Sequence, residues 1–182
     1  RSLAEPRAVR LRRALEALGP IFVKFGQVLS PRRDLMPPDI ADELAKLQDE
    51  VPPFPAEQAL AEVERSFGSP AETGFASFDR ESLAAASIAQ VHAARLHSGE
   101  DVVVKVLRPR VRQLIQQDLE VMYTVARLAW RWWPEARRLR PVEVVREYET
   151  TILNELDLLR EAANATPLRR NWQGSPLSYV PT

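Results

Sequence analysis

The sequence predicts an α+β fold in which a small antiparallel sheet lies between two helical segments. Apolar residues recur every three or four positions before residue 70 and again after Pro109, which is the period of an amphipathic helix. Between these segments, two apolar runs are joined by His97-Ser98-Gly99-Glu100, a short connection typical of a β-hairpin. Strands grouped between helices favour α+β over a doubly wound parallel sheet.

The helical segment at the amino terminus is divided by glycine and proline. The apolar spacing predicts four helices, at residues 9–18, 21–29, 38–47 and 56–67. Gly19-Pro20 ends the first helix, and Gly68-Ser69-Pro70 ends the fourth. Pro52-Pro53-Phe54-Pro55 forms a rigid connector before the fourth. We therefore expect residues 1–74 to form a helical extension and residues 75–182 to form a second, incomplete domain.

Three strands are predicted after this extension. Residues 75–79 suit a short strand, and residues 87–96 and 101–107 suit longer ones. In the last strand the alternation places Val102, Val104 and Val106 on one face and Lys105 on the other.

Two long helices are predicted to follow, at residues 111–133 and 142–172. Three tryptophans end the first of them beside Arg127 and Arg131: Trp130, Trp132 and Trp133. Two interpretations of this cluster stay open, a surface that docks another helix and a contact with a membrane interface.

Composition narrows the classes of function. The 182 residues carry 25 basic and 25 acidic side chains, so no general electrostatic field would attract a nucleic acid. The absence of cysteine excludes disulfides, thiolate catalysis and a sulfur-bound zinc. No apolar run approaches roughly 18 residues, so we expect no spanning helix. The chain begins with Arg1 rather than Met, and we expect it to be part of a longer protein.

Lysine is scarce, with three lysines against 22 arginines. Because the two side chains are not interchangeable at phosphates or in tight ion pairs, a retained lysine suggests a site that needs a compact ammonium. Lys24 and Lys105 fall in the most motif-like positions, whereas Lys46 lies in a charged helical stretch and is interpreted as surface.

Lys24 and Gln27 are candidates for one binding face. They lie three positions apart, so on a helix they can reach the same ligand or partner. Gly26 between them costs about 1 kcal/mol of helix propensity relative to Ala, which indicates a close backbone approach. The structural alternative is a helix-packing glycine beside two exposed polar residues.

Lys105 is a candidate phosphate ligand, because a lysine on a strand can hold the α- and β-phosphates of a nucleotide. Such a lysine needs a carboxylate partner, and the candidates are Glu155, Asp157 and Glu161. On a regular helix Asp157 and Glu161 share a face, while Glu155 lies about 200° away from Asp157. All three therefore cannot point at one ion, and ordinary surface carboxylates are the alternative.

Ala84-Ala85-Ala86-Ser87 lies where a phosphate-covering loop would precede the first long strand. Alanine restricts the backbone freedom that glycine would offer, and alone the pattern indicates only a small-residue turn. No Walker-type lysine loop and no G-x-G-x-x-G pattern occurs. His92 and His97 lack a second ligand pattern and are interpreted as structural, so we assign no metal-binding residue.

Together these pieces resemble the UbiB family of atypical kinase-like proteins, which is associated with ubiquinone biosynthesis. The matching motifs are, in order, Leu18-Gly19-Pro20-Ile21-Phe22-Val23-Lys24-Phe25-Gly26-Gln27, Leu47-Gln48-Asp49-Glu50-Val51-Pro52-Pro53, Ala84-Ala85-Ala86-Ser87-Ile88-Ala89-Gln90-Val91-His92, Val104-Lys105, Glu155-Leu156-Asp157 and Arg160-Glu161-Ala162-Ala163. Several motifs in the family's order and spacing make the resemblance specific, although each motif alone is weak.

The resemblance implies a protein-kinase-like small lobe with family-specific helices over a nucleotide cleft. It assigns Ala84 to Ser87, Lys105 and Glu161 to binding ATP or ADP, with Lys105 paired to Glu161. It assigns catalytic roles to four residues: Lys24 and Gln27, which would project into the cleft, and Glu155 and Asp157, which would be further acidic partners of Lys105. It also implies Mg in the complete protein, a quinone-pathway lipid or protein partner, and a place at the cytoplasmic side of a membrane. The balanced charge, rather than the resemblance, argues against a nucleic-acid partner.

A kinase fold also needs a second lobe with a catalytic-loop Asp, a metal-binding Asn and a D-F-G-like Asp. No such pattern follows Ala163, although residues 177–180 could begin another strand. We therefore expect the chain to bind nucleotide as part of an atypical kinase or ATPase, without turning it over alone. The alternative is a non-catalytic, pseudokinase-like scaffold that binds a partner protein or a membrane surface.

Overall fold

The computed structural model describes residues 5–49 and 51–173, so the strand expected at residues 177–180 lies outside the described residues. The chain forms two compact units, Arg1–Val125 and Ala126–Thr182, and each is described by itself. The predicted domain boundary after residue 74 stays a prediction.

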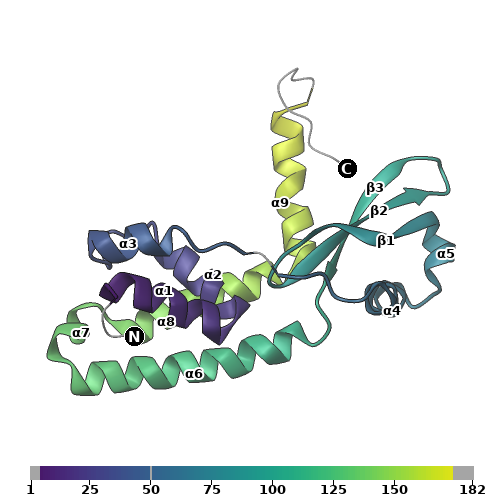
Figure 1. The fold of residues 1–182 in the computed structure, drawn as a ribbon. Helices are drawn as coiled ribbons and strands as arrows, with labels where there is room; N and C mark the ends of the chain where they lie inside the picture. The colour runs from purple at the N-terminus through teal and green to yellow at the C-terminus, as the bar shows by residue number, and fades with distance from the viewer. Residues whose placement is uncertain (1–4, 50, 174–182) are drawn as a thin grey trace. The chain divides into compact units, whose positions relative to one another are not determined.

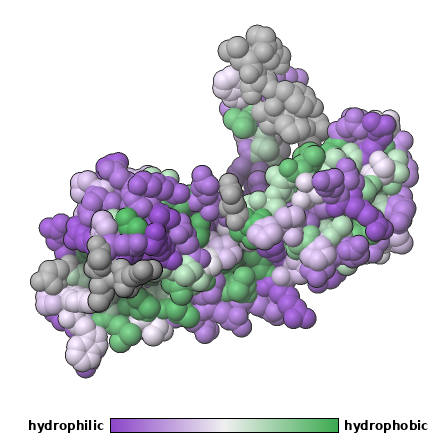
Figure 2. Space-filling view, viewed as in Figure 1, coloured by the Kyte–Doolittle hydropathy of each residue, from purple (hydrophilic) through white to green (hydrophobic). Residues whose placement is uncertain are grey.

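Three helices form a layer at the start of the first unit: α1 (Arg7–Leu18), α2 (Pro20–Leu29) and α3 (Pro38–Leu44) (Figure 1). Gly19 separates the first two with φ 114°, a value that favours glycine, and Pro20 then begins α2 at the position where its missing N–H costs nothing. Leu47 lies beyond α3, which is shorter than predicted, but its side chain is still buried. The outer surface over α1 and α3 is mostly hydrophilic in the view of Figure 2.

Gly26 explains how closely these helices pack. A Cβ at this position would overlap the Leu47 side chain and would lie 2.9 Å from Leu15 Cδ1. Leu15, Leu44 and Leu47 are all buried around it. The glycine therefore has the packing role that the sequence offered as its structural alternative.

The second part of this unit is a sheet with two helices. Helices α4 (Ala56–Phe67) and α5 (Ala71–Gly74) precede three antiparallel strands in the order β1 (Phe75–Ala85), β2 (Ala89–Leu96) and β3 (Asp101–Leu107). Helix α4 ends at Gly68, whose φ of 66° is left-handed. One face of the sheet packs on α4 and α5 in a cluster of buried residues: Phe54, Ala59, Val63, Ala71, Phe75, Ala94 and Val106. The predicted α+β class is thus confirmed.

The strand predictions were right in number and partly wrong in extent. The alternation in β3 is confirmed, because Val102, Val104 and Val106 face the cluster while Lys105 is exposed. Strand β1 continues to Ala85 instead of ending near residue 79, so two of the four predicted loop residues belong to a strand. Irregular pairing between Phe78 and Ser82 interrupts the alternation, which hides the later half of the strand in the sequence.

Helix α6 (Val111–Trp132) joins the two units, and the second unit also contains α7 (Pro134–Arg138), α8 (Pro141–Glu155) and α9 (Leu158–Asn171). The prediction of one helix over residues 142–172 was wrong. The chain leaves the helical region at Asp157 (φ −91°, ψ 83°), whose carboxylate accepts the Arg160 N–H at 3.0 Å and caps α9. The capping hydrogen bond of Asp157 favours the start of α9 over a continuation of α8.

Two further observations concern α6. Trp130 and Trp132 near its end and Trp133 directly after it are exposed, Trp132 at 71%, and both interpretations of this cluster stay open. Arg137 covers Trp130, with its guanidinium carbon 5.3 Å from the ring centroid. Among the described residues, we find no helix with both the length and the apolar character needed to cross a bilayer.

Candidate functional site

Lys105 lies in a row of residues that crosses the sheet. In the strand register Val91 pairs with Lys105 on one side and with Ala84 on the other. Residues paired directly in an antiparallel sheet project from the same face, and neighbouring strands are about 4.8 Å apart. Ala84 and Lys105 therefore share one face, two strands apart. This is the face opposite the apolar cluster, and both residues are exposed on it.

The alanine-rich segment makes the turn between β1 and β2. Ala84 and Ala85 end β1, and the Ala86 N–H donates to the Ala89 carbonyl at 2.8 Å, which closes the turn. Ser87 is completely buried in it. The four predicted nucleotide-loop residues thus divide into two on the strand and two in the turn.

Both polar groups of the Ala86–Ser87 peptide are bonded to charged side chains. Arg108 Nε donates to the Ala86 carbonyl at 3.0 Å, and the Ser87 N–H donates to Asp49 Oδ1 at 3.0 Å. The Ser87 hydroxyl also donates to Asp49 and lies 3.3 Å from the Pro20 carbonyl oxygen. A hydroxyl has one proton, so the carboxylate, the stronger acceptor, takes it.

Arg108 connects this turn to the proline-rich connector. Its Nη2 donates to the Pro52 carbonyl at 2.7 Å, and its guanidinium carbon lies 5.4 Å from the centre of the Phe54 ring. Burial lowers the pKa of Arg108, and the nearby Asp49 carboxylate acts in the opposite direction. An arginine stays protonated under such a shift, so Arg108 keeps its positive charge beside the Ala86 carbonyl.

A second buried chain of hydrogen bonds runs alongside. Gln90 accepts from the Phe54 N–H at 3.0 Å and donates from Nε2 to the Phe54 carbonyl at 3.4 Å. Its Nε2 also lies 2.7 Å from His92 Nε2, and His92 Nδ1 lies 2.8 Å from the Asp79 carbonyl. A carbonyl only accepts, so His92 donates from Nδ1 and accepts at Nε2. Both bonded ring nitrogens agree with a structural histidine.

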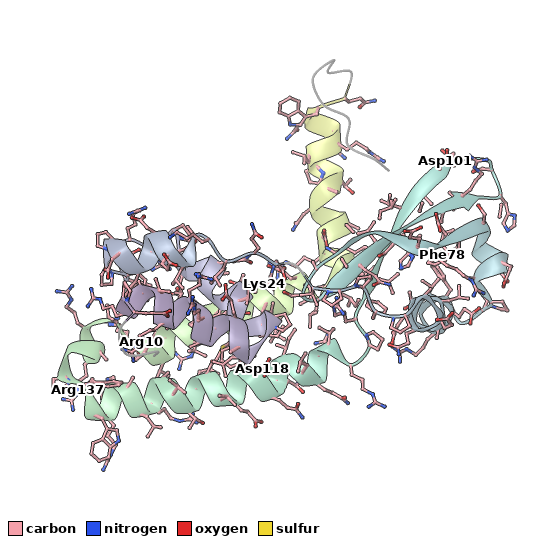
Figure 3. All side chains as sticks on the ribbon, viewed as in Figure 1. Arg10, Lys24, Phe78, Asp101, Asp118 and Arg137 are labelled. Atoms are coloured by element: carbon pink, nitrogen blue, oxygen red, sulfur yellow. The ribbon has the colours of Figure 1, made fainter. Side chains whose placement is uncertain are left out.

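On α2, Lys24 and Gln27 are partly buried (Figure 3 labels Lys24). Gln27 Nε2 donates to the Leu47 carbonyl at 3.1 Å. Gln27, predicted to project toward a ligand, is thus committed at least in part to the segment that follows α3. Lys46 is exposed and paired with Glu43, as expected of a surface lysine.

The three predicted carboxylates do not lie on one regular helix. Glu155 is the last residue of α8, Asp157 is the cap of α9, and Glu161 lies in the first turn of α9. The angle expected between Glu155 and Asp157 is therefore wrong, because the helix breaks between them. Asp157 uses its side chain locally, as the cap. Pairing of Glu161 with Lys105 stays a prediction.

The sequence did not predict a role in this site for three residues: Asp49, Gln90 and Arg108. Asp49 and Gln90 stood inside motifs, but no local pattern showed what they bond. Arg108 offered a weaker signal, a charged residue directly after an apolar strand. Among the described residues no group of three His, Asp or Glu side chains could hold a metal ion.

Comparison with known proteins gives concordant matches. A family model described as the ABC1 atypical kinase-like domain matches residues 46–182. Proteins named "Probable protein kinase UbiB" are 62% identical over 181 residues in Pseudomonas aeruginosa (strain LESB58), 62% over 177 in Azotobacter vinelandii and 58% over 175 in Marinobacter nauticus. These matches cover 96–100% of this chain and 32–34% of the relatives. The chain thus spans about a third of their length.

Proposed function

The chain belongs to the ABC1 atypical kinase-like family, and from this premise we propose that it is the nucleotide-binding amino-terminal part of a longer atypical kinase or ATPase. The observation that carries the proposal is the row Ala84, Val91 and Lys105. In protein kinases the phosphate-covering loop joins the first two strands and the phosphate-binding lysine lies on the third. The alanine-rich turn and Lys105 occupy those two places.

The chemistry of the row suits phosphate. An ammonium on the open face is a point charge that can approach phosphate oxygens, and the small side chain of Ala84 leaves space beside it. The bound nucleotide would be ATP or ADP, and ATP would supply the phosphoryl group. We keep the pairing of Lys105 with Glu161, the acidic roles of Glu155 and Asp157, and Mg in the complete protein within the proposal, on the family resemblance.

The name of the relatives, UbiB, supports a role in ubiquinone biosynthesis. We propose that the complete protein acts there on a quinone-pathway lipid or with a protein partner, at the cytoplasmic side of a membrane. Exposed Trp130, Trp132 and Trp133 favour a second candidate, a pseudokinase-like scaffold that binds a partner or a membrane surface without catalysis.

Nucleotide titration of the complete protein tests the first candidate. We expect Lys105→Ala to lower the affinity for ATP and ADP by about ten- to hundredfold, the size of a lost bond to a charged group. Arg95→Ala is the matched control, because Arg95 is a cation on the same sheet and its partner is Asp101, at 2.7 Å. Affinity for nucleotide in both variants like that of the parent would contradict the proposal and favour the scaffold. Steady ADP release by the 182-residue chain alone would contradict our expectation that it lacks turnover.

A further inference from the structure

The Ala86–Ser87 peptide group is held from both sides. The Arg108 guanidinium bonds its carbonyl and the Asp49 carboxylate bonds its N–H, at 3.0 Å each. Bonds to ionised partners are shorter and stronger than neutral ones, and here one peptide plane receives two of opposite sign. Rotation of this peptide would break both, so its orientation in the turn is set by side chains from outside the hairpin.

Both of these side chains are tied to the segment between α3 and α4. Asp49 lies in that segment, and Arg108 bonds the Pro52 carbonyl and covers Phe54. Gln90 bonds the backbone of Phe54 at both its N–H and its carbonyl. We call residues 47–49 and 51–54 of this segment the strap.

The strap is also joined to α2, at its other end. Gln27 donates to the Leu47 carbonyl, two residues before Asp49. The buried Leu47 side chain occupies the space beside Gly26. Ser87, in the turn, lies 3.3 Å from the carbonyl of Pro20, the first residue of α2 and one turn before Lys24. Helix α2, which carries Lys24 and Gln27, is therefore linked to the alanine-rich turn through a few hydrogen-bonded residues.

We propose that Asp49 and Gln27 are positioning residues that set the conformation of the alanine-rich turn through the strap, and that this conformation determines how tightly the turn binds nucleotide phosphates. The second half rests on the proposed function. Gln27 then acts on the nucleotide site through Leu47 and Asp49. A turn released from the strap must be ordered when a nucleotide binds, and that ordering costs conformational entropy.

The experiment measures two quantities in the complete protein: hydrogen exchange over residues 84–90 without nucleotide, and the dissociation constants of ATP and ADP. For Asp49→Ala we expect faster exchange at Ser87 and about tenfold weaker nucleotide binding. Asp49→Asn keeps an oxygen that accepts the Ser87 N–H, so its hydrogen exchange at Ser87 and its nucleotide affinity should stay close to those of the parent. Asp42→Asn is the control, because it removes an exposed carboxylate of the α1–α3 layer that is paired with Arg33. Its hydrogen exchange and its nucleotide dissociation constants should match those of the parent.

Gln27→Ala provides the second arm. Gln27→Ala should raise the rate of hydrogen exchange in the same turn. In the double variant, the change in nucleotide affinity should be less than the sum of the changes in Gln27→Ala and Asp49→Ala, because both substitutions act through the strap. Additive effects, or unchanged exchange in Asp49→Ala, would overturn the strap as the positioning element. If exchange rises and nucleotide affinity does not change while Lys105→Ala loses binding, the positioning role is wrong and the proposed function stands. If Lys105→Ala also binds like the parent, the proposed function fails and this inference fails with it.

Discussion

Two regions of the first unit hold charged and polar side chains in opposite ways. The helical layer α1–α3 carries ion pairs at its surface, such as Arg7 with Asp39 and Arg33 with Asp42, with both partners about half or more exposed. The sheet end also has an exposed ion pair, Arg95 with Asp101, but in addition it buries polar side chains, since Ser87, Gln90 and His92 are each at most 1% exposed. Within the described residues, no buried side-chain nitrogen or oxygen lacks a hydrogen-bond partner.

The two kinds of contact differ in how much they contribute to the stability of the folded protein. Exposed ion pairs contribute little, at a median of about 0–1 kcal/mol, because water and salt screen them. A buried polar group left without its partner costs about 1–3 kcal/mol. We therefore expect the layer to be held by apolar packing around Gly26, and the sheet end by specific hydrogen bonds. Three changes test this comparison.

Gln90→Leu should have the largest effect. Leucine has a similar volume, but it leaves the Phe54 N–H and carbonyl unpaired and removes the donor to His92 Nε2. We expect the free energy of unfolding to fall by about 2–4 kcal/mol, measured by urea denaturation. Gln116→Leu, at an exposed position of α6, should change it by less than about 0.5 kcal/mol. Equal effects would mean that the buried amide has no special role.

Gly26→Ala should have an intermediate effect on the helical layer. Overpacking costs about 1–3 kcal/mol, and alanine regains about 1 kcal/mol of helix propensity, so we expect a net loss of about 1 kcal/mol. Gly74→Ala is the matched control, since a Cβ there meets no atom within 4 Å. It should be neutral or slightly stabilising in the same thermal or urea melt. A stabilising Gly26→Ala would show that the layer is packed more loosely than the structure indicates.

Glu43 should make a smaller and pH-dependent contribution to the free energy of unfolding. Hydrogen bonds from Lys46 and then Arg12 lower the pKa of Glu43 below its ordinary 4.5. A carboxyl whose pKa is lower when folded stabilises the protein above its unfolded pKa, and this contribution disappears as the pH falls through the folded pKa. Between about pH 6 and about pH 3, stability should therefore fall less steeply in Glu43→Gln than in the parent.

Lys46→Gln is the control for the cause of this shift, because it removes the larger of the two hydrogen bonds. It should flatten the same pH profile in part. Parallel stability profiles for the parent and both variants would show that the ion pairs of Glu43, like the more exposed pairs of the layer, have no measurable effect on stability.

The sequence by itself determined the fold class and the order of the longer elements, whereas the short helices α5 and α7 and the division between α8 and α9 were not predicted. Signals that act over a few residues were sufficient for this: Gly19-Pro20 between α1 and α2, Gly68 after α4, and the four-residue hairpin connection. Strict alternation in β3 also placed Lys105 on the face opposite Val102, Val104 and Val106. The motifs in their order indicated the family before the fold was known.

Only the tertiary structure decided what holds the site together. Asp49 meets Ser87 across 38 residues, Phe54 meets Gln90 across 36, and Arg108 meets Pro52 across 56. No local propensity specifies such partners, because they depend on which segments the apolar packing brings together. The break at Asp157 was missed for a related reason: an aspartate fits either a helix surface or a cap, and the bond to the Arg160 N–H selects the cap. Periodicity positions a lysine on a strand, whereas the strap around its neighbouring turn exists only in the folded chain.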